Sequence, residues 1–398
     1  MSSKSLQTEM VQAGVHSLAE MPDYVSVPKV PPIYMSSVFS FDDVPSLDAV
    51  YAKEAPGYVY SRDGNPGTDY TADMIAQTEG GECALVFSSG MAAILQSIIA
   101  FIGQGDHVVS SPVLYGGVYN YLKNEAPRFG VETTFVDFTD LAAVEAAIKP
   151  NTKVVYTETI TNPLMEVFDL EAIAKIAHKH GCKFIVDNTF ASGAICKPLE
   201  LGADIVANSS TKFMGGHSDV TGGSVVTSPE NWAPIKRGLA MYGPIMSPFD
   251  AWLMARSLRT MDMRVARHSE NALKVAQFLE NHPKIEKVHY PGLESSPYHA
   301  LAMKMFYKGR CGGMLSADIP GGEKGASDFI KNLKHIKFVP SLASYTTSLS
   351  YPAKTSHRAY NEEELKAAGI TMGTLRFSIG LEEPEDIIEE FDAALAKL

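Results

Sequence analysis

The stretch Ala203-Asp-Ile-Val-Ala-Asn-Ser-Ser-Thr-Lys-Phe-Met-Gly-Gly-His217-Ser-Asp219 decides the fold class and points to the chemistry. Its pattern predicts an apolar strand that ends in hydroxyl residues, one lysine and a glycine-rich loop. A lysine fixed in a polar pocket at the end of a strand can act as an amine nucleophile, so Lys212 is a candidate. Ser209 and Thr211 beside it can bind phosphate oxygens. The alternative interpretation of Lys212 is a surface lysine in a turn.

Three further stretches carry residues that suit the same site. Asp187 ends a predicted buried strand, where a carboxylate is costly unless a cation or several donors meet it. Gly90 and Met91 stand at a predicted strand-to-helix turn, where free N–H groups suit a phosphate. Tyr115 adds an aromatic ring next to glycines. Taken singly, these features also fit a loop-capping aspartate, an ordinary turn and a core tyrosine.

Together, these features predict one binding site for pyridoxal 5′-phosphate. Its aldehyde requires an amine, which Lys212 supplies, and its pyridinium nitrogen requires an anion, which Asp187 supplies. Its ring would stack on Tyr115. The residues assigned to its phosphate lie at a strand end or a helix start: Gly90, Met91, Ser209 and Thr211.

From about residue 67 to 264, short apolar runs alternate with amphipathic segments such as Leu141–Lys149 and Leu170–His180. The predicted strands are Ala84–Phe87, His107–Ser110, Glu132–Val136, Lys153–Tyr156, Lys183–Val186, Asp204–Ala207 and Ser224–Val226. Strands buried on both faces are continuous Val/Ile/Phe runs. The pattern therefore predicts an α/β domain with a mostly parallel sheet covered by helices.

The two ends of the chain differ from this region. Prolines such as Pro31, Pro32, Pro56 and Pro66 interrupt any long helix before it, so we predict an irregular arm that lies on its own body or on a partner subunit. After about residue 265, one long helix and a closing helix frame short strands predicted at Lys287–Tyr290, Met314–Ala317 and Leu375–Ile379. The predicted parts are an arm at 1–66, a cofactor-binding large domain at 67–264 and a smaller α+β domain at 265–398.

Composition excludes several classes of protein. The chain has 398 residues and a formal charge of −12, without a dense basic block, which argues against nucleic acid and anionic membranes as partners. Its four cysteines are far apart, and neither a Cys-x-x-Cys nor a His-Glu-x-x-His motif occurs, so we predict no disulfide scaffold and no metal site. The amino terminus lacks the apolar core of a secretion signal. We therefore expect a cytoplasmic protein.

On these residues, the sequence resembles the Cys/Met-metabolism family of pyridoxal-phosphate enzymes over nearly its whole length. The matching stretches are Tyr60-Ser-Arg62-Asp-Gly-Asn-Pro66, Ser88-Ser-Gly-Met91, Leu114-Tyr-Gly-Gly117, Asp187-Asn-Thr-Phe-Ala191, Ser209 to Asp219, Tyr290-Pro-Gly-Leu293, Ser341-Leu342, His357 and Leu375-Arg-Phe-Ser-Ile-Gly380. The resemblance implies a fold-type I large domain, similar to that of aspartate aminotransferase. It also implies a homotetramer built from two tight dimers.

The resemblance adds roles that the residues alone do not indicate. It implies that Tyr60 and Arg62 reach into the neighbouring subunit's site and bind its cofactor phosphate. It also implies that Arg376 binds the substrate carboxylate as a bidentate fork, helped by Ser341 and Asn162. Without the resemblance, a surface pair in a loop and a solvated arginine on a strand would be the simpler interpretations.

The catalytic residues implied by the resemblance are Lys212, Asp187 and Tyr115. Lys212, freed from the cofactor by the substrate amine, would remove the Cα proton, and Asp187 would keep the ring nitrogen protonated. Tyr115 is the candidate acid for the leaving γ-group, or mainly a stacking ring. Expulsion of that group leads either to 2-oxobutanoate and ammonia, in a lyase, or to capture of a thiol, in a synthase.

Departures from the family pattern narrow the activity. Methionine γ-lyases usually carry a cysteine in place of Gly117 and a Lys-Asp pair in place of Ala240-Met241, which argues against a specialised methionine γ-lyase. Thr346 stands where many members carry a glutamate, which argues against cystathionine as the substrate.

Our leading hypothesis is a γ-lyase for a small homoserine-type amino acid: methionine, homocysteine or an O-substituted homoserine such as canavanine. The alternative enzyme is a γ-replacement transferase, either a cystathionine γ-synthase or an O-acetylhomoserine sulfhydrylase. A third hypothesis is a protein that keeps the cofactor but only binds or regulates. The joint presence of Lys212, Tyr115, Asp187 and Arg376 argues against it.

Overall fold

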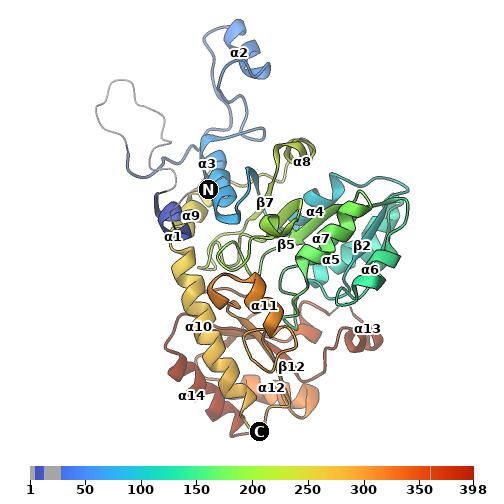
Figure 1. Cartoon of the computed structure of the whole chain (residues 1–398). Helices are drawn as coiled ribbons and strands as arrows, with labels where there is room; N and C mark the ends of the chain where they lie inside the picture. The colour runs from blue at the N-terminus through green and yellow to red at the C-terminus, as the bar shows by residue number, and fades with distance from the viewer. Residues whose placement is uncertain (1–4, 13–27, 359) are drawn as a thin grey trace.

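The chain forms two β-sheets joined by one long helix. The computed structural model describes residues 5–12, 28–358 and 360–398. Figure 1 shows the larger sheet with its helices above the smaller one, and helix α10 (Met261–Glu280) running along the side of the molecule between them. Helix α10 passes through the boundary predicted at 264/265. The division into domains stays a prediction.

The larger sheet has seven strands in the order β1-β7-β6-β5-β4-β2-β3. Their bounds are β1 Cys83–Phe87, β2 His107–Ser110, β3 Glu132–Phe135, β4 Thr152–Glu158, β5 Lys183–Asp187, β6 Ile205–Asn208 and β7 Gly223–Thr227. Strand β7 is antiparallel to both of its neighbours, and the other pairs are parallel. The predicted strands and the mostly parallel sheet are therefore confirmed.

Helices cover both faces of this sheet because consecutive strand residues point to opposite sides. In β5, Phe184 and Val186 join one core, and Ile185 joins the other. The helices of this half are α3 Pro66–Glu79, α4 Gly90–Ile99, α5 Gly116–Asn120, α6 Leu141–Ala147, α7 Leu170–Lys179, α8 Pro229–Tyr242 and α9 Pro248–Leu258. Since helices cover both faces of the sheet, polar side chains gather at the carboxyl ends of the parallel strands.

The smaller sheet has five strands in the order β10-β11-β12-β9-β8. They are β8 Lys287–His289, β9 Met314–Asp318, β10 Lys337–Phe338, β11 Ser348–Ser350 and β12 Thr374–Ser378. The accompanying helices are α10, α11 His299–Met305, α12 Gly322–Asn332, α13 Glu362–Ala367 and α14 Pro384–Leu395. Strands β8, β9 and β12 match the prediction, whereas the short β10 and β11 were not predicted.

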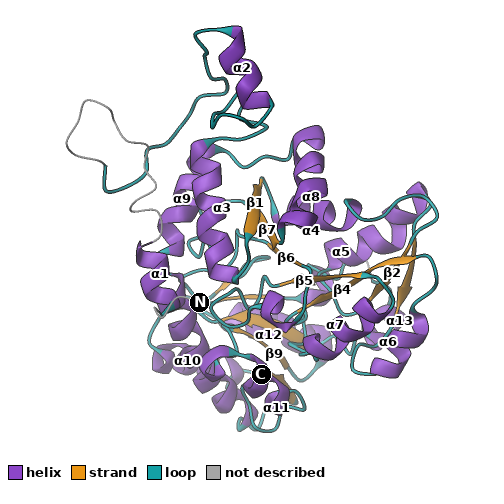
Figure 2. Cartoon of the chain, turned by 45° about the horizontal axis from the view of Figure 1, so that its top comes forward, coloured by secondary structure: helices purple, strands orange, loops and turns teal. Residues whose placement is uncertain are grey.

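Only part of the amino-terminal segment departs from the body of the molecule, because Met10 near its start is 2% exposed and packs in the larger core. The segment contains the short helices α1 (Leu6–Gln12) and α2 (Val44–Tyr51), and α2 projects away from the sheets in Figure 2. Part of the predicted arm, residues 1–4 and 13–27, lies outside the described residues. Pro66 does not interrupt a helix as predicted. It begins α3, where a missing N–H is harmless, after the cap formed by Asn65. No helix among the described residues has the length and apolar character needed to cross a bilayer.

Strand β12 connects the small core to the polar region between the sheets. Phe377 is 0% exposed and packs on Phe391 and Phe329, with ring centroids 5.0 Å and 6.1 Å away. Its neighbour Arg376 points to the opposite face because side chains alternate along a strand. The packing of Phe377 therefore holds the strand that carries Arg376.

We predict that Phe377→Ala lowers the free energy of unfolding by about 3–5 kcal/mol, the usual cost of removing a buried aromatic ring. Phe377→Leu should cost less because it refills most of the space. The control is Phe129→Ala, since Phe129 is 67% exposed. Urea unfolding measures the free energy of unfolding of all three variants, if its dependence on urea concentration has the same slope in each. Equal midpoints for Phe377→Ala and Phe129→Ala would contradict the prediction.

Candidate active site

A cavity of about 600 Å³ lies at the carboxyl ends of β4, β5 and β6, facing residues of the small sheet. Every predicted site residue except Tyr60 and Arg62 lines it: Gly90, Met91, Tyr115, Asn162, Asp187, Ser209, Thr211, Lys212, Ser341 and Arg376. The fold thus brings together side chains that are up to 286 positions apart in the chain (376 − 90). Their individual roles stay predictions.

Lys212 occupies the turn after β6, as its sequence context predicts. Its Nζ donates a hydrogen bond to the hydroxyl of Ser341 at 3.0 Å. Burial, and then the charge of Arg376, lower the pKa of Lys212 to about 8. Near neutral pH, Lys212 is therefore a neutral amine in a minor part of the molecules, and this is the form that attacks an aldehyde.

Asp187 ends β5 and is buried, with an exposed fraction of 6%. The amide of Thr189 donates to its Oδ1 at 2.8 Å. Burial raises the pKa of Asp187 to about 6. A protonated ring nitrogen beside it would restore full ionisation, because an opposite charge favours the charged form.

Glu158 is a buried carboxylate that the sequence reasoning missed. It ends β4 directly beside Asp187 in the sheet register. Its carboxylate accepts hydrogen bonds from the amides of Tyr115 at 2.7 Å and Asn162 at 3.0 Å. Burial, and then the charge of Asp187, raise the pKa of Glu158 well above its ordinary value. The available signal was an acidic residue at the end of an apolar run, as at Asp187.

The start of α4 carries the residues that we predict to form the phosphate cradle. Ser89 caps the helix and accepts from the amide of Ala92 at 3.2 Å. Among the described residues, the amides of Gly90 and Met91 meet no acceptor, as expected for the first turn of a helix. A Cβ on Gly90 would lie 2.4 Å from that of Ser209, so only glycine lets the helix approach this close.

Thr211 lines the cavity, yet its hydroxyl is engaged within its own loop. It donates to the carbonyl of Gly222 at 3.1 Å and accepts from the amide of the same residue at 2.9 Å. Its second lone pair remains available, but its proton is used. A contact with phosphate would therefore need this hydroxyl to turn.

Arg376 is a buried guanidinium with donors to spare. Its Nη1 donates to Oδ1 of Asn162 at 2.8 Å, whereas its Nε meets no partner among the described residues. Burial lowers the pKa of Arg376 to about 10, so it stays charged at neutral pH. A buried cation with an unused donor is costly unless an anion binds it, which suits a substrate carboxylate.

Tyr115 precedes α5 at the cavity wall, with an exposed fraction of 42%. Gly117 lies beneath the ring, and a Cβ there would come within 2.7 Å of the ring's Cε1. A cysteine at position 117, the residue that the resemblance associates with methionine γ-lyases, would displace the ring. Glycine in place of cysteine at position 117 therefore allows the Tyr115 ring to lie where it does in the cavity.

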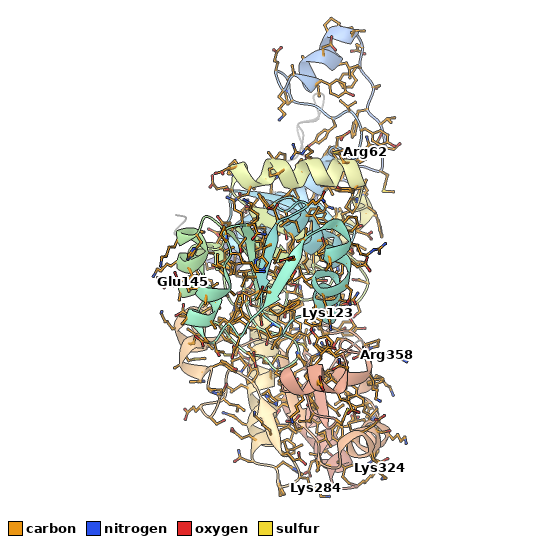
Figure 3. The ribbon with its side chains drawn as sticks, turned by 90° about the vertical axis from the view of Figure 1, so that its right-hand side faces the viewer. Arg62, Lys123, Glu145, Lys284, Lys324 and Arg358 are labelled. Atoms are coloured by element: carbon orange, nitrogen blue, oxygen red, sulfur yellow. The ribbon has the colours of Figure 1, made fainter. Side chains whose placement is uncertain are left out.

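Tyr60 and Arg62 do not join the cavity of their own chain. Both are exposed on the arm, with the guanidinium carbon of Arg62 5.1 Å from the centre of the Tyr60 ring. Figure 3 shows Arg62 near the projecting end of the molecule, well away from Arg358, which lines the cavity. Their contact with a neighbouring subunit's cofactor stays a prediction.

The donor set fits pyridoxal 5′-phosphate. The cavity holds a partly neutral amine in Lys212, a buried anion in Asp187, and unused amides at Gly90 and Met91. These groups match the aldehyde, the ring nitrogen and the phosphate in turn. The unpartnered guanidinium of Arg376 then remains for the carboxylate of an amino acid.

Comparison with known proteins agrees with this cofactor. A model of the family described as "Cys/Met metabolism PLP-dependent enzyme" matches residues 7–396. The chain therefore belongs to this family and is an enzyme that uses pyridoxal 5′-phosphate.

Individual relatives cover almost the whole chain. The L-methionine gamma-lyase of Fusobacterium nucleatum subsp. polymorphum is 43% identical over 92% of this chain and 93% of its own length. The O-succinylhomoserine sulfhydrylase of Pseudomonas aeruginosa is 37% identical over 92% and 90%. The crystal structure of the metY protein of Campylobacter jejuni, which holds N′-pyridoxyl-lysine-5′-monophosphate, superposes with a TM-score of 0.93 at 29% identity, over 99% of this chain and 100% of that one.

We predict that Gly90→Ala weakens the binding of pyridoxal 5′-phosphate roughly tenfold to a hundredfold, because overpacking against Ser209 costs about 1–3 kcal/mol and distorts the cradle. The matched control is Gly103→Ala, where an added Cβ makes only ordinary contact at 3.7 Å. Titration of the cofactor-free variants measures both dissociation constants. Equal affinities would contradict the assigned cradle.

We also predict that the cofactor-free protein takes up pyridoxal 5′-phosphate faster as the pH rises, with a midpoint at about pH 8, because only the neutral amine of Lys212 attacks. Arg376→Gln should move the midpoint upward, since the charge of Arg376 helps to lower this pKa. Stopped-flow absorbance measures the rates, with the exposed Lys153→Gln as control. A midpoint at the ordinary lysine value of 10.5 would refute the assignment.

Proposed function

We propose that the protein eliminates the γ-substituent of a homoserine-type amino acid and releases 2-oxobutanoate and ammonia. The observation that carries this proposal is the convergence of Lys212, Asp187 and Arg376 on one cavity, with the pKa of Lys212 lowered to about 8. Methionine, homocysteine and O-substituted homoserines are the candidate substrates. The similarity to the Fusobacterium L-methionine gamma-lyase supports this choice.

We assign each residue a task that its position supports. Bound pyridoxal 5′-phosphate supplies an electron sink for the pair left at Cα. Arg376 binds the substrate carboxylate and thereby turns the Cα–H bond toward Lys212, whose neutral amine removes the proton. Asp187 holds a proton at the pyridine nitrogen. A second proton would leave Cβ, and its electron pair would form the Cβ–Cγ double bond as the γ-substituent departs. Tyr115, at the cavity wall, would donate a proton to the departing γ-atom.

The alternative function is γ-replacement, in which a thiol rather than water ends the reaction. The similarity to the O-succinylhomoserine sulfhydrylase of Pseudomonas aeruginosa supports this second candidate. The first half of the chemistry, up to expulsion of the γ-group, would be the same. The two functions therefore differ in what enters the cavity after the leaving group has departed.

We infer that the working form is a homotetramer of two tight dimers in the cytoplasm. The arm supports the assembly, because it exposes apolar side chains such as Met35 (67%) and Val38 (57%) that a partner subunit would cover. In this arrangement, Tyr60 and Arg62 reach the partner's phosphate site. The division into an arm at 1–66, a large domain at 67–264 and a small domain at 265–398 belongs to the same proposal.

We predict that the enzyme forms 2-oxobutanoate from methionine or an O-acylhomoserine without added thiol. Lys212→Ala should lower kcat by about 10²–10⁴-fold or more, because the base that removes the Cα proton is gone. The control variant is Lys153→Ala, at an exposed lysine outside the cavity. If thioether forms with thiol while 2-oxobutanoate never appears, the lyase proposal is wrong and the replacement function holds.

A further inference from the structure

A buried carboxylate outside the cavity has no part in the proposed function. Glu79 is the last residue of α3, it is 0% exposed, and it does not line the cavity. A carboxylate in such a place is costly unless several donors or a cation meet it. The cation whose charge acts on it, Lys197, forms its own ion pair with Glu200 at 3.9 Å. Hydrogen bonds must therefore stabilise Glu79.

Three N–H donors meet this carboxylate. Its Oε2 accepts from the side-chain amide of Asn188 at 2.8 Å. Its Oε1 accepts from the side-chain amide of Asn208 and from the backbone amide of Gly193, both at 3.1 Å. Burial still raises the pKa of Glu79 to about 7, although these three hydrogen bonds lower it. The carboxylate thus joins the end of α3 to segments that are far away in the sequence.

Two of these donors adjoin residues of the cavity. Asn188 directly follows Asp187, which ends β5. Asn208 ends β6 and directly precedes Ser209. The two strand ends are also joined to each other, because the backbone amide of Asn188 donates to the carbonyl oxygen of Ala207 at 2.8 Å. One carboxylate therefore holds both strand ends at the point where the cavity begins.

Glu79 holds these strand ends from the face of the sheet that α3 covers. Asn208 points to the same face as Val206, because side chains two positions apart share a face of a strand. Val206 joins the same core as Ile75 of α3, whereas Ala207 joins the other core. The carboxylate can therefore act on the site without contact with the cofactor.

The side chain of Asn188 is fixed in one orientation. Its Nδ2 faces two acceptors, the carboxylate of Glu79 and the carbonyl oxygen of Cys196, which also lies at 2.8 Å. Its Oδ1 accepts from the hydroxyl of Thr159 at 2.7 Å. Thr159 directly follows Glu158, so the network also reaches the end of β4. Loss of the Glu79 acceptor would leave a buried donor without a partner.

We propose that Glu79 is a positioning residue for pyridoxal 5′-phosphate. Through Asn188 it fixes Asp187 in the place that meets the ring nitrogen. Through Asn208 it fixes Ser209 in the place that faces the phosphate. The inference goes beyond the proposed function, because it concerns how the cofactor is held and not which γ-substituent leaves.

Glu79→Gln should weaken the binding of pyridoxal 5′-phosphate about tenfold or more. The amide group that replaces one carboxylate oxygen faces Asn188 or Asn208 donor to donor, so a buried donor loses its acceptor. Equilibrium dialysis of the holoenzyme variants measures the dissociation constants. The matched control is Glu82→Gln, since Glu82 is exposed three positions further along the chain.

A paired substitution tests the contact itself. Asn188→Asp alone sets two carboxylates face to face and should also weaken cofactor binding. The double variant Glu79→Gln/Asn188→Asp has one donor and one acceptor again, with their places exchanged. It should therefore bind the cofactor more tightly than either single variant. The carbonyl oxygen of Cys196 loses its donor in both variants at position 188, so the recovery is partial.

The visible absorbance of the bound cofactor separates positioning from stability. When Asp187 is displaced, the ring nitrogen loses its proton more easily, and the nitrogen of Lys212 that joins the cofactor keeps a proton to higher pH. The absorbance band of Glu79→Gln should therefore change at a higher pH than that of the wild type. The control Asn271→Ala removes another buried amide, which donates to two backbone carbonyls outside the cavity. It should lower the stability to urea without moving the cofactor affinity or the band.

Three results would overturn the inference. The first is equal affinity and an unshifted band in Glu79→Gln and Glu82→Gln, and the second is a double variant that binds no better than either single variant. If Glu79→Gln does not fold, Asn208→Ala takes its place, because it removes one donor and leaves the carboxylate intact. Asn208→Ala should weaken cofactor binding about threefold or more, and an unchanged dissociation constant is the third result.

Discussion

The pairing of two buried carboxylates at adjacent strand ends is the constraint on which the site depends. Glu158 and Asp187 end β4 and β5 side by side in the parallel register. Buried carboxylates are tolerated only where donors meet them, so each one fixes nearby groups. Glu158 holds the amides of Tyr115 and Asn162, and Asn162 in turn accepts from Arg376. A single carboxylate thus positions the aromatic ring and, through one intermediate, the guanidinium.

Burial shifts the pKa values of acids and bases in the cavity in opposite directions. It raises the pKa of Asp187 to about 6 and lowers that of Lys212 to about 8. Both shifts reflect the cost of an ion in a poorly solvated place. The same removal of water keeps a neutral amine available for proton transfer and leaves the carboxylate ready for a cationic ring nitrogen.

The proteins similar to this chain are named for different reactions. They include an L-methionine gamma-lyase and an O-succinylhomoserine sulfhydrylase. We propose that the shared chemistry belongs to the depth of the cavity, which Lys212, Asp187 and Arg376 line. The choice of substrate would then depend on the wall of the cavity. Gly117 sets the place of the Tyr115 ring in that wall.

Local pattern determined the strands of the large sheet, the turn that carries Lys212 and the carboxylate of Asp187, because each depends on residues close in sequence. Strands as short as β10 (Lys337–Phe338) and β11 (Ser348–Ser350) show too little periodicity to be predicted. Only the tertiary structure decided which side chains meet: Lys212 with Ser341, 129 positions away, and Arg376 with Asn162, 214 positions away. The tertiary structure also decided the partners of Glu158, because the residues beside a strand end are known only once the strands are paired. Burial, which sets the pKa values, is a property of the whole fold.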